Sequence, residues 1–333
     1  MCAARTLGIG KLPVLLLGRL LAAAEGSRTA DVLLGPAVGE DACAIDLPGG
    51  VLVVSTDPVT LVGRDLGRYA VTVNANDVAV TGVRPRWFLA TVLLPPGSTE
   101  PETAALFAQL GEALAGCGVA LVGGHSEVTA AVRQVVVVGQ MIGFAEDRRF
   151  VTTGGVREGQ VVFQVGVAPV EGAAVLASGF STKLGGLDPE VLEAVEAALD
   201  RPGISVVDAA LLAADLGATA MHDPTEGGLA AGLHEMAAAS KVRLRVDRDQ
   251  VLWWEPALEV CRAVGVDPWA TLASGSLLAA FDASVADTAA NAFAQAGHRA
   301  AVIAVAEAGE GVLETSGEPV AWPERDEISR LMD

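Results

Sequence analysis

The chain has 333 residues, of which 51% are hydrophobic and 38 are glycines, a composition typical of a folded protein with many turns. With 22 basic and 41 acidic residues, its formal net charge is −19. Nucleic acids and anionic membranes are bound through clustered Lys and Arg, so this charge argues against both as partners. It does not exclude an anionic nucleotide, because bound cations can reverse the local field.

The four cysteines, at positions 2, 43, 117 and 261, are far apart and form no Cys-x-x-Cys pair. They predict neither a zinc site nor a disulfide framework, and they suit a reducing cytoplasm. Residues 11–26 have the apolar character of a secretory signal, but Arg19 splits the run and leucines recur at helical spacing. We expect an amphipathic helix there and no membrane span elsewhere, since no other apolar run reaches ~18 residues.

The first half alternates between predicted strands and helices. In chain order we expect a strand at 51–56, a helix at 67–81, a strand at 87–94, a helix from 101 to about 117, and strands at 119–124 and 132–143. In the first of these helices Asn74, Asp77 and Thr81 fall at i, i+3 and i+7, which predicts one polar stripe.

The pattern breaks into glycine and charge at residues 152–160, which predicts a boundary between domains at 1–154 and 155–333. After it we expect strands at 161–166, 217–223, 242–246, 276–281 and 300–305, and helices at 170–178, 189–199, 206–216, 225–239, 256–263 and 286–295. The alternation predicts an α/β fold whose two halves are each a mixed sheet covered by helices.

Four short acidic motifs stand beside hydrophobic segments: GEDACAI (39–45), STDP (55–58), NAND (74–77) and GGHSEVT (123–129). Each places a carboxylate at a predicted turn or helix edge, where a charge is costly unless it is paired or bound. If these motifs converge on one site, their carboxylates would repel one another unless a cation lies among them. The four carboxylates are those of Asp41, Asp57, Asp77 and Glu127. Such oxygen ligands suit Mg²⁺, which uses a few carboxylates and the phosphates of a nucleotide. Any one of the four, taken alone, is better explained as a solvated loop residue.

Together with HDPTEGGLAAGL (222–233), these motifs resemble the AIR synthase superfamily from about Gly10 to Val305, in particular its HypE branch of hydrogenase formation proteins. The resemblance implies a two-domain α/β fold with a C-terminal α/β sandwich. It also implies that the N-terminal halves of two subunits pair into a dimeric β-barrel. ATP and magnesium would then lie in the cleft between the halves.

The resemblance also assigns site residues. Asp41, Asp57 and Asp77 would bind metal or phosphate, and Asp223 and Thr225 would be catalytic. The expected nucleotide contacts are Lys11, Thr56, Asn76, Gly123, Gly124, Gly227 and Gly228. The alternative for Lys11 is an ordinary surface lysine. Two interpretations are open for Gly227 and Gly228. Their backbone N–H groups could face a phosphate at the start of a helix, or the glycines could allow close helix packing.

Two positions depart from the family pattern. His125 replaces the acidic residue after the first glycine pair, and it is a poor magnesium ligand because the ion prefers oxygen. Glu127 would supply the missing carboxylate. His125 would instead contact a phosphate, act as general acid or base, or be structural. Glu226 stands where the HypE motif has arginine.

HypE acts on a cysteine at its own C-terminus, whereas this sequence ends EISRLMD. We therefore expect an ATP- and magnesium-dependent, homodimeric enzyme that activates or phosphorylates an oxygen of an unidentified small-molecule or protein acceptor. Three alternatives stay open: hydrogenase maturation proper, a small-molecule kinase like thiamine-monophosphate kinase, and a non-catalytic nucleotide-binding assembly protein.

Overall fold

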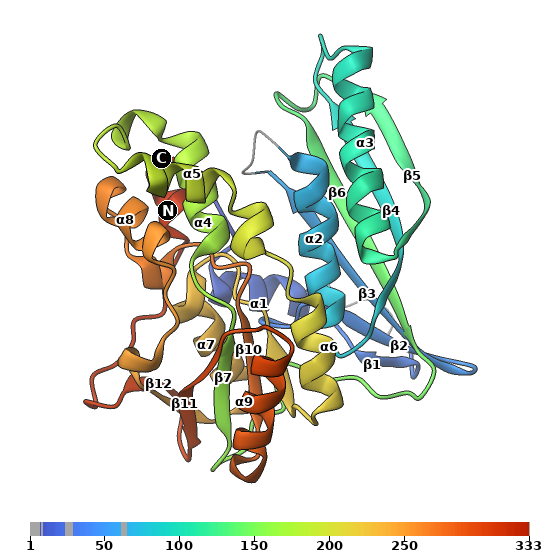
Figure 1. The fold of residues 1–333 in the computed structure, drawn as a ribbon. Helices are drawn as coiled ribbons and strands as arrows, with labels where there is room; N and C mark the ends of the chain where they lie inside the picture. The colour runs from blue at the N-terminus through green and yellow to red at the C-terminus, as the bar shows by residue number, and fades with distance from the viewer. Residues whose placement is uncertain (1–6, 8, 24–28, 61–64, 333) are drawn as a thin grey trace, which may run out of the picture.

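The computed structural model describes residues 7, 9–23, 29–60 and 65–332. Two six-stranded sheets with helices packed on them make up the protein, one in each half of the chain (Figure 1). The chain passes from the first sheet to the second between Ala145 and Val161. The predicted α/β fold with two halves is confirmed. Among the described residues, no helix combines the length and apolar character needed to cross a membrane.

The described part of the first half contains three helices and an open sheet of strand order β1-β2-β3-β6-β4-β5. Its elements are α1 (Val14–Ala23), β1 (Val32–Leu34), β2 (Cys43–Leu47), β3 (Gly50–Val59), α2 (Leu66–Ala79), β4 (Pro85–Leu94), α3 (Glu100–Cys117), β5 (Ala120–Val128) and β6 (Val136–Ala145). Helices α2 and α3 cover one face of this sheet (Figure 1). Leu106, Leu110 and Leu114 recur every four residues and form the buried stripe of α3.

The second half forms a sheet of order β12-β9-β11-β7-β10-β8. Its elements are β7 (Val161–Val165), α4 (Val170–Gly179), α5 (Pro189–Glu196), α6 (Val207–Asp215), β8 (Ala220–His222), α7 (Gly228–Ser240), β9 (Arg243–Val246), α8 (Glu255–Val264), β10 (Leu277–Phe281), α9 (Ala286–Gln295), β11 (Ala300–Glu307), β12 (Gly311–Glu314) and α10 (Glu327–Leu331). Helix α7 packs with Val162, while α6 and α9 pack with Phe163, its neighbour. Helices therefore cover both faces, which explains why every residue of β10 is buried.

Several element boundaries differ from the sequence prediction. Strand β3 continues through Asp57 to Val59, and β5 continues through His125 to Val128, so both motifs lie inside strands instead of at turns. The short elements β1, β2, β12 and α10 were not predicted. The described cysteines, Cys43, Cys117 and Cys261, are unpaired, and Cys2 and residues 24–28 lie outside the described residues.

A buried amide joins the two halves. The side chain of Asn76 on α2 donates to the carbonyl oxygen of Ile204 at 2.8 Å and accepts from the N–H of Val206 at 2.9 Å. Asn76 is fully buried. Although we expected a nucleotide contact at this position, its side chain bonds to the backbone of the other half, which holds the polar stripe of α2 at the boundary between the halves.

Candidate functional site

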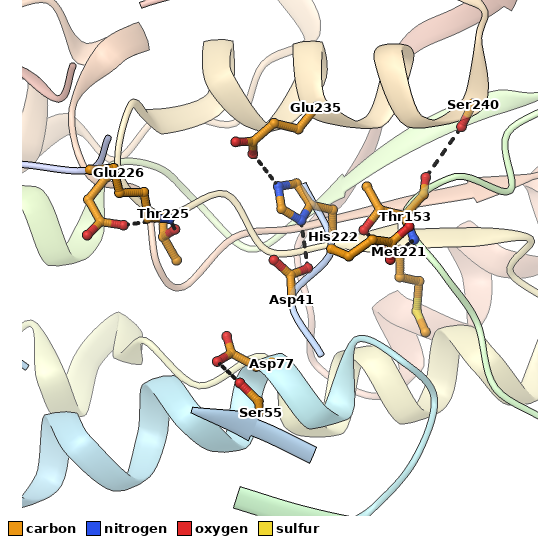
Figure 2. Close-up of polar contacts among 12 residues, drawn as sticks. Asp41, Ser55, Asp77, Thr153, Met221, His222, Thr225, Glu226, Glu235 and Ser240 are labelled. Carbon is orange, nitrogen blue, oxygen red and sulfur yellow. Dashed lines mark hydrogen bonds and ion pairs between the residues drawn. The ribbon is translucent and has the colours of Figure 1, made fainter. Parts of the chain in front are cut away.

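A buried histidine connects three distant segments at the end of β8. His222 Nδ1 lies 2.7 Å from Asp41 Oδ2, and its Nε2 lies 2.8 Å from Glu235 Oε2 on α7 (Figure 2). Burial disfavours a charged ring, but the carboxylates of Asp41 and Glu235 outweigh this and raise the pKa of His222 well above its usual value. An imidazolium here fixes the orientation of both carboxylates.

Asp223 is the next residue in the sequence. It is 1% exposed, and neither of its carboxylate oxygens has a hydrogen-bond partner among the described residues. One potential ligand atom from each of Asp41, His222 and Asp223 lies within 4.8 Å of the others. Burial raises the pKa of Asp223, and the charge of Asp41 adds to this rise. A buried carboxylate of this kind is costly unless a cation or proton balances it.

Two further carboxylates face this group from the first half. Ser55 Oγ donates to Asp77 Oδ2 at 2.5 Å (Figure 2), and the Asn74 side chain accepts from the backbone N–H of Asp57 at 2.9 Å. Burial raises the pKa of Asp77, and the nearby charges of Asp57, Asp223 and Asp41 raise it further. Burial also raises the pKa of Asp57, to about 6. The structure thus brings Asp41, Asp57 and Asp77 together and adds Asp223; these four are called the acidic cluster below.

A lysine from the N-terminal segment lies at the rim of the acidic cluster. Lys11 Nζ donates to Thr225 Oγ1 at 3.0 Å and lies 2.8 Å from Glu226 Oε2. Glu226, the residue that replaces the arginine of the HypE motif, therefore has a basic partner from a different part of the chain. The charge of Asp57, a member of the cluster, also acts on the ammonium group of Lys11.

The glycine pair at the start of α7 is used for packing. The N–H of Gly227 donates to Asp326 Oδ2 at 2.8 Å, and that of Gly228 donates to the Thr225 carbonyl at 3.0 Å. Gly228 has a φ of +64°, and a Cβ there would lie 2.5 Å from the Trp269 carbonyl oxygen. Because both N–H groups already have acceptors, the geometry favours the close-packing interpretation over the phosphate-binding one.

The GGHSEVT motif lies elsewhere. All nine residues of β5 are exposed, and β5 is the outer strand of its sheet, on the side away from the second half (Figure 1). Three strand spacings, about 14 Å, separate β5 from β3 and Asp57. Within one chain, therefore, Glu127 does not join the acidic cluster as expected. The His125 ring instead lies 3.5 Å from the Glu127 carboxylate.

Two other expected contacts have backbone roles. Gly124 has a φ of +148°, and a Cβ there would lie 2.0 Å from the Ala90 carbonyl oxygen, so this glycine, next to Gly123, permits the pairing of β5 with β4. Thr56 donates to the Gly139 carbonyl at 2.8 Å and is exposed. Successive strand residues face opposite sides, so Ser55 and not Thr56 faces Asp77.

The sequence reasoning missed His222, Glu235 and Ser55. His222 directly precedes Asp223 in a motif that was already singled out. Glu235 is the only Asp, Glu, Lys or Arg in the sequence of α7, and a single carboxylate in an otherwise apolar helix is costly without a partner. The position of His222 next to Asp223 and the isolated charge of Glu235 were both visible in the sequence.

Comparisons with known proteins agree with the fold. Residues 39–145 match the AIR synthase related protein N-terminal domain, and residues 157–315 match its C-terminal domain. The carbamoyl dehydratase HypE of Rhodobacter capsulatus is 30% identical over 232 residues, which cover 68% of this chain and 66% of that protein. The thiamine-monophosphate kinase of Mycobacterium tuberculosis is 30% identical over 256 residues, which cover 74% and 73%.

A solved structure of the hydrogenase maturation protein HypE in complex with ATP has the same fold. Its TM-score is 0.70 at 22% identity, and the match covers 93% of this chain and 91% of that one. At this identity the likeness shows the fold alone. The matched domains and the relatives at 30% identity show the family, and the chain belongs to the AIR synthase-related proteins.

Proposed function

We propose that this protein is an enzyme that binds ATP through magnesium ions and uses it to phosphorylate or activate an oxygen of an acceptor molecule. The observation that carries the proposal is Asp223, a buried carboxylate with two unpartnered oxygens beside three further aspartates. Carboxylate oxygens are the ligands that Mg²⁺ prefers. ATP is supported by the HypE protein of the same fold whose structure was solved in complex with ATP.

The chain's own residues would divide the work. The acidic cluster would hold the ions, which neutralise charge on the phosphates when they are bound. This makes Asp223 a metal ligand and not the catalytic residue expected from the sequence. His222 and Glu235 would orient Asp41, as residues behind metal ligands commonly do. Lys11 and Thr225 would contact a phosphate from the rim.

Calorimetric titration with ATP, in magnesium and in EDTA, tests the metal bridge. Two like charges at ~4 Å repel by about 4 kcal/mol at an effective dielectric of 20, so the acidic cluster should reject ATP that lacks a cation. We expect measurable affinity only in magnesium. Equal affinity in EDTA would contradict the proposal.

The acceptor distinguishes the remaining alternatives. The relatives at 30% identity include a carbamoyl dehydratase and a small-molecule kinase, and each name describes that protein only. Phosphorus NMR of the protein with Mg·ATP, alone and with thiamine monophosphate or carbamoyl phosphate, follows the fate of the γ-phosphate. ATP that binds and stays intact with both acceptors would exclude these two activities and is the result expected of a non-catalytic assembly protein.

We also propose that two copies pair along β5 into a homodimer. Leu121, Val122 and Val128 are 50%, 53% and 60% exposed, and an edge strand with exposed apolar side chains is a template for pairing with another chain. Such pairing would bring His125 and Glu127 against the second copy, where they could reach an acidic cluster.

A substitution on β5 tests the dimer. Val122→Lys places a charge on the proposed interface, and light scattering after gel filtration should change from dimer to monomer. The matched control is Val305→Lys, since Val305 is 42% exposed on β11 in the other half. A monomeric wild-type protein, or a Val122→Lys variant that remains dimeric, would contradict this proposal.

A further inference from the structure

The segment that carries Lys11 packs against the last helix of the chain. A Cβ at Gly10 would lie 2.8 Å from Ser329 Oγ and 3.1 Å from Ser329 Cβ, so the backbone of Gly10 lies directly on α10. Residues 9–11 and α10, from opposite ends of the chain, thus lie together on the second half (Figure 1). The function proposed above uses Lys11 and gives α10 no role.

Helix α10 is itself fixed to the second half. Ile328 is fully buried in a hydrophobic cluster with residues of α4 and α8, and Ser329 is fully buried beside it. Asp326 caps the helix, because its Oδ1 accepts from the N–H of Ile328 at 2.8 Å. The other carboxylate oxygen, Oδ2, accepts from the N–H of Gly227 at 2.8 Å. The surface on which Gly10 rests is therefore a fixed part of the fold.

Residues 225–227 of the buried motif contact both ends of the chain. The side chains of the first two contact the Lys11 ammonium group, and the backbone N–H of the third donates to Asp326. Since Gly10 also packs on Ser329, each of the three segments touches the other two. These contacts form a closed ring at the rim of the acidic cluster.

The position of Lys11 depends on such a support. A lysine has a flexible four-carbon stem, so it holds a phosphate well only where its backbone is fixed beforehand. Helix α1, which follows, has no buried residue. On the other side, Gly10 has a φ of +114°, which residues with a side chain rarely adopt, and Ser329 leaves no room for one. The backbone next to Lys11 is therefore held at Gly10, by α10.

We propose that α10 positions Lys11 for its phosphate contact. Ser329 fixes the backbone at Gly10, and Asp326 fixes α10 relative to the residues that Lys11 contacts. Both are positioning residues, which act on the nucleotide through Lys11. The inference rests on the proposed function, which supplies the phosphate. The match to the family's C-terminal domain ends at residue 315, so α10 lies beyond that match.

Limited trypsin digestion of the full chain without nucleotide tests the placement directly. Cleavage after Lys11 requires its segment to leave α10, and mass spectrometry follows the rate, with cleavage after the exposed Arg149 as internal standard. Gly10→Ala directs a methyl group at Ser329, so cleavage after Lys11 should be about tenfold faster, and Asp326→Ala should act in the same direction. Adding Ser329→Gly to Gly10→Ala removes both atoms that the methyl group meets and should restore part of the protection.

Calorimetric titration with Mg·AMPPNP tests the consequence for the nucleotide. Lys11→Met removes the charge and should weaken binding by about tenfold or more, because a charge-assisted hydrogen bond is lost. Asp326→Ala should weaken binding by about fivefold, and it should have no further effect in the Lys11→Met background, because it acts through Lys11. The control Glu318→Ala, exposed in the same C-terminal segment, should change neither binding nor cleavage.

Unchanged cleavage after Lys11 in both Gly10→Ala and Asp326→Ala would overturn the inference. An equal loss of affinity for Asp326→Ala with and without Lys11→Met would also overturn it, since that residue would not act through Lys11. If melting curves show that Asp326→Ala does not fold, the rescue of Gly10→Ala by Ser329→Gly decides. Failure of AMPPNP to bind the wild type, or unchanged affinity in Lys11→Met, would contradict the proposed function alone, because the digestion needs no nucleotide.

Discussion

Two glycine-flanked acidic motifs of similar sequence character have opposite surroundings in this protein. His222 and Asp223 of HDPTEGG are buried where both halves meet, and His222 contacts Asp41, 181 positions away, and Glu235 on α7. In GGHSEVT the residues up to Val128 are exposed, and His125 and Glu127 lie against each other on an edge strand. Residue types therefore predict which ligands a motif can bind. Strand order decides whether the motif lies near the other site residues of the same chain.

The largest effect is expected for a substitution in the buried motif, at Asp223. Asp223→Asn keeps the shape of the side chain but removes its charge, so magnesium-dependent ATP turnover should fall by about 100-fold or more. The melting temperature without ligand should hold or rise, because repulsion among buried carboxylates decreases. Turnover and thermal melting are measured together, with Asp287→Asn, exposed on α9, as control. Early melting with full activity would make Asp223 a structural residue.

A smaller effect is expected for a residue that lies behind the proposed metal ligands. Glu235→Gln removes the charge that holds the His222 ring, so Asp41 should be less well oriented. The magnesium concentration needed for half-maximal ATP binding should rise by about tenfold or more, the size typical of residues behind metal ligands. Turnover at saturating magnesium should change less. A magnesium titration that matches the wild type would show that the histidine link has no part in metal binding.

The smallest effects are expected on β5, and they could break the comparison. Glu127→Gln should raise the magnesium requirement by about threefold, since exposed charges interact weakly, and His125→Asn should not change it. If His125 contacts a phosphate or transfers a proton, His125→Asn should instead lower turnover at unchanged magnesium dependence. Titrations of both variants distinguish these roles. If neither variant changes the magnesium dependence or the turnover, His125 and Glu127 have no part in the activity.

Local patterns predicted the larger elements well. The helix expected at 67–81 is α2, Leu66–Ala79, because its apolar and polar positions recur with the helical period. The strand expected at 87–94 is β4, Pro85–Leu94, in which buried and less buried positions alternate. Short strands such as β12 depend on their partner, here β9, and leave a weak pattern of their own.

The site was harder to predict than the elements. Side chains on β3 alternate between the two faces of the sheet, so Ser55 faces Asp77 and its neighbour Thr56 does not. The composition of the strand does not show which of the two faces the site. The distance between β5 and the acidic cluster depends on strand order, a long-range property. The meeting of His222 with Asp41 spans 181 positions in sequence and follows from the packing of the two halves.

The bridge made by Asn76 has a mechanical consequence. A rotation of one half against the other at this point would have to break both hydrogen bonds of a buried amide. Asp77 is the next residue on the same rigid helix, so such a rotation would also displace its carboxylate from Asp223. The orientation of the two halves and the arrangement of the acidic cluster are therefore coupled through α2.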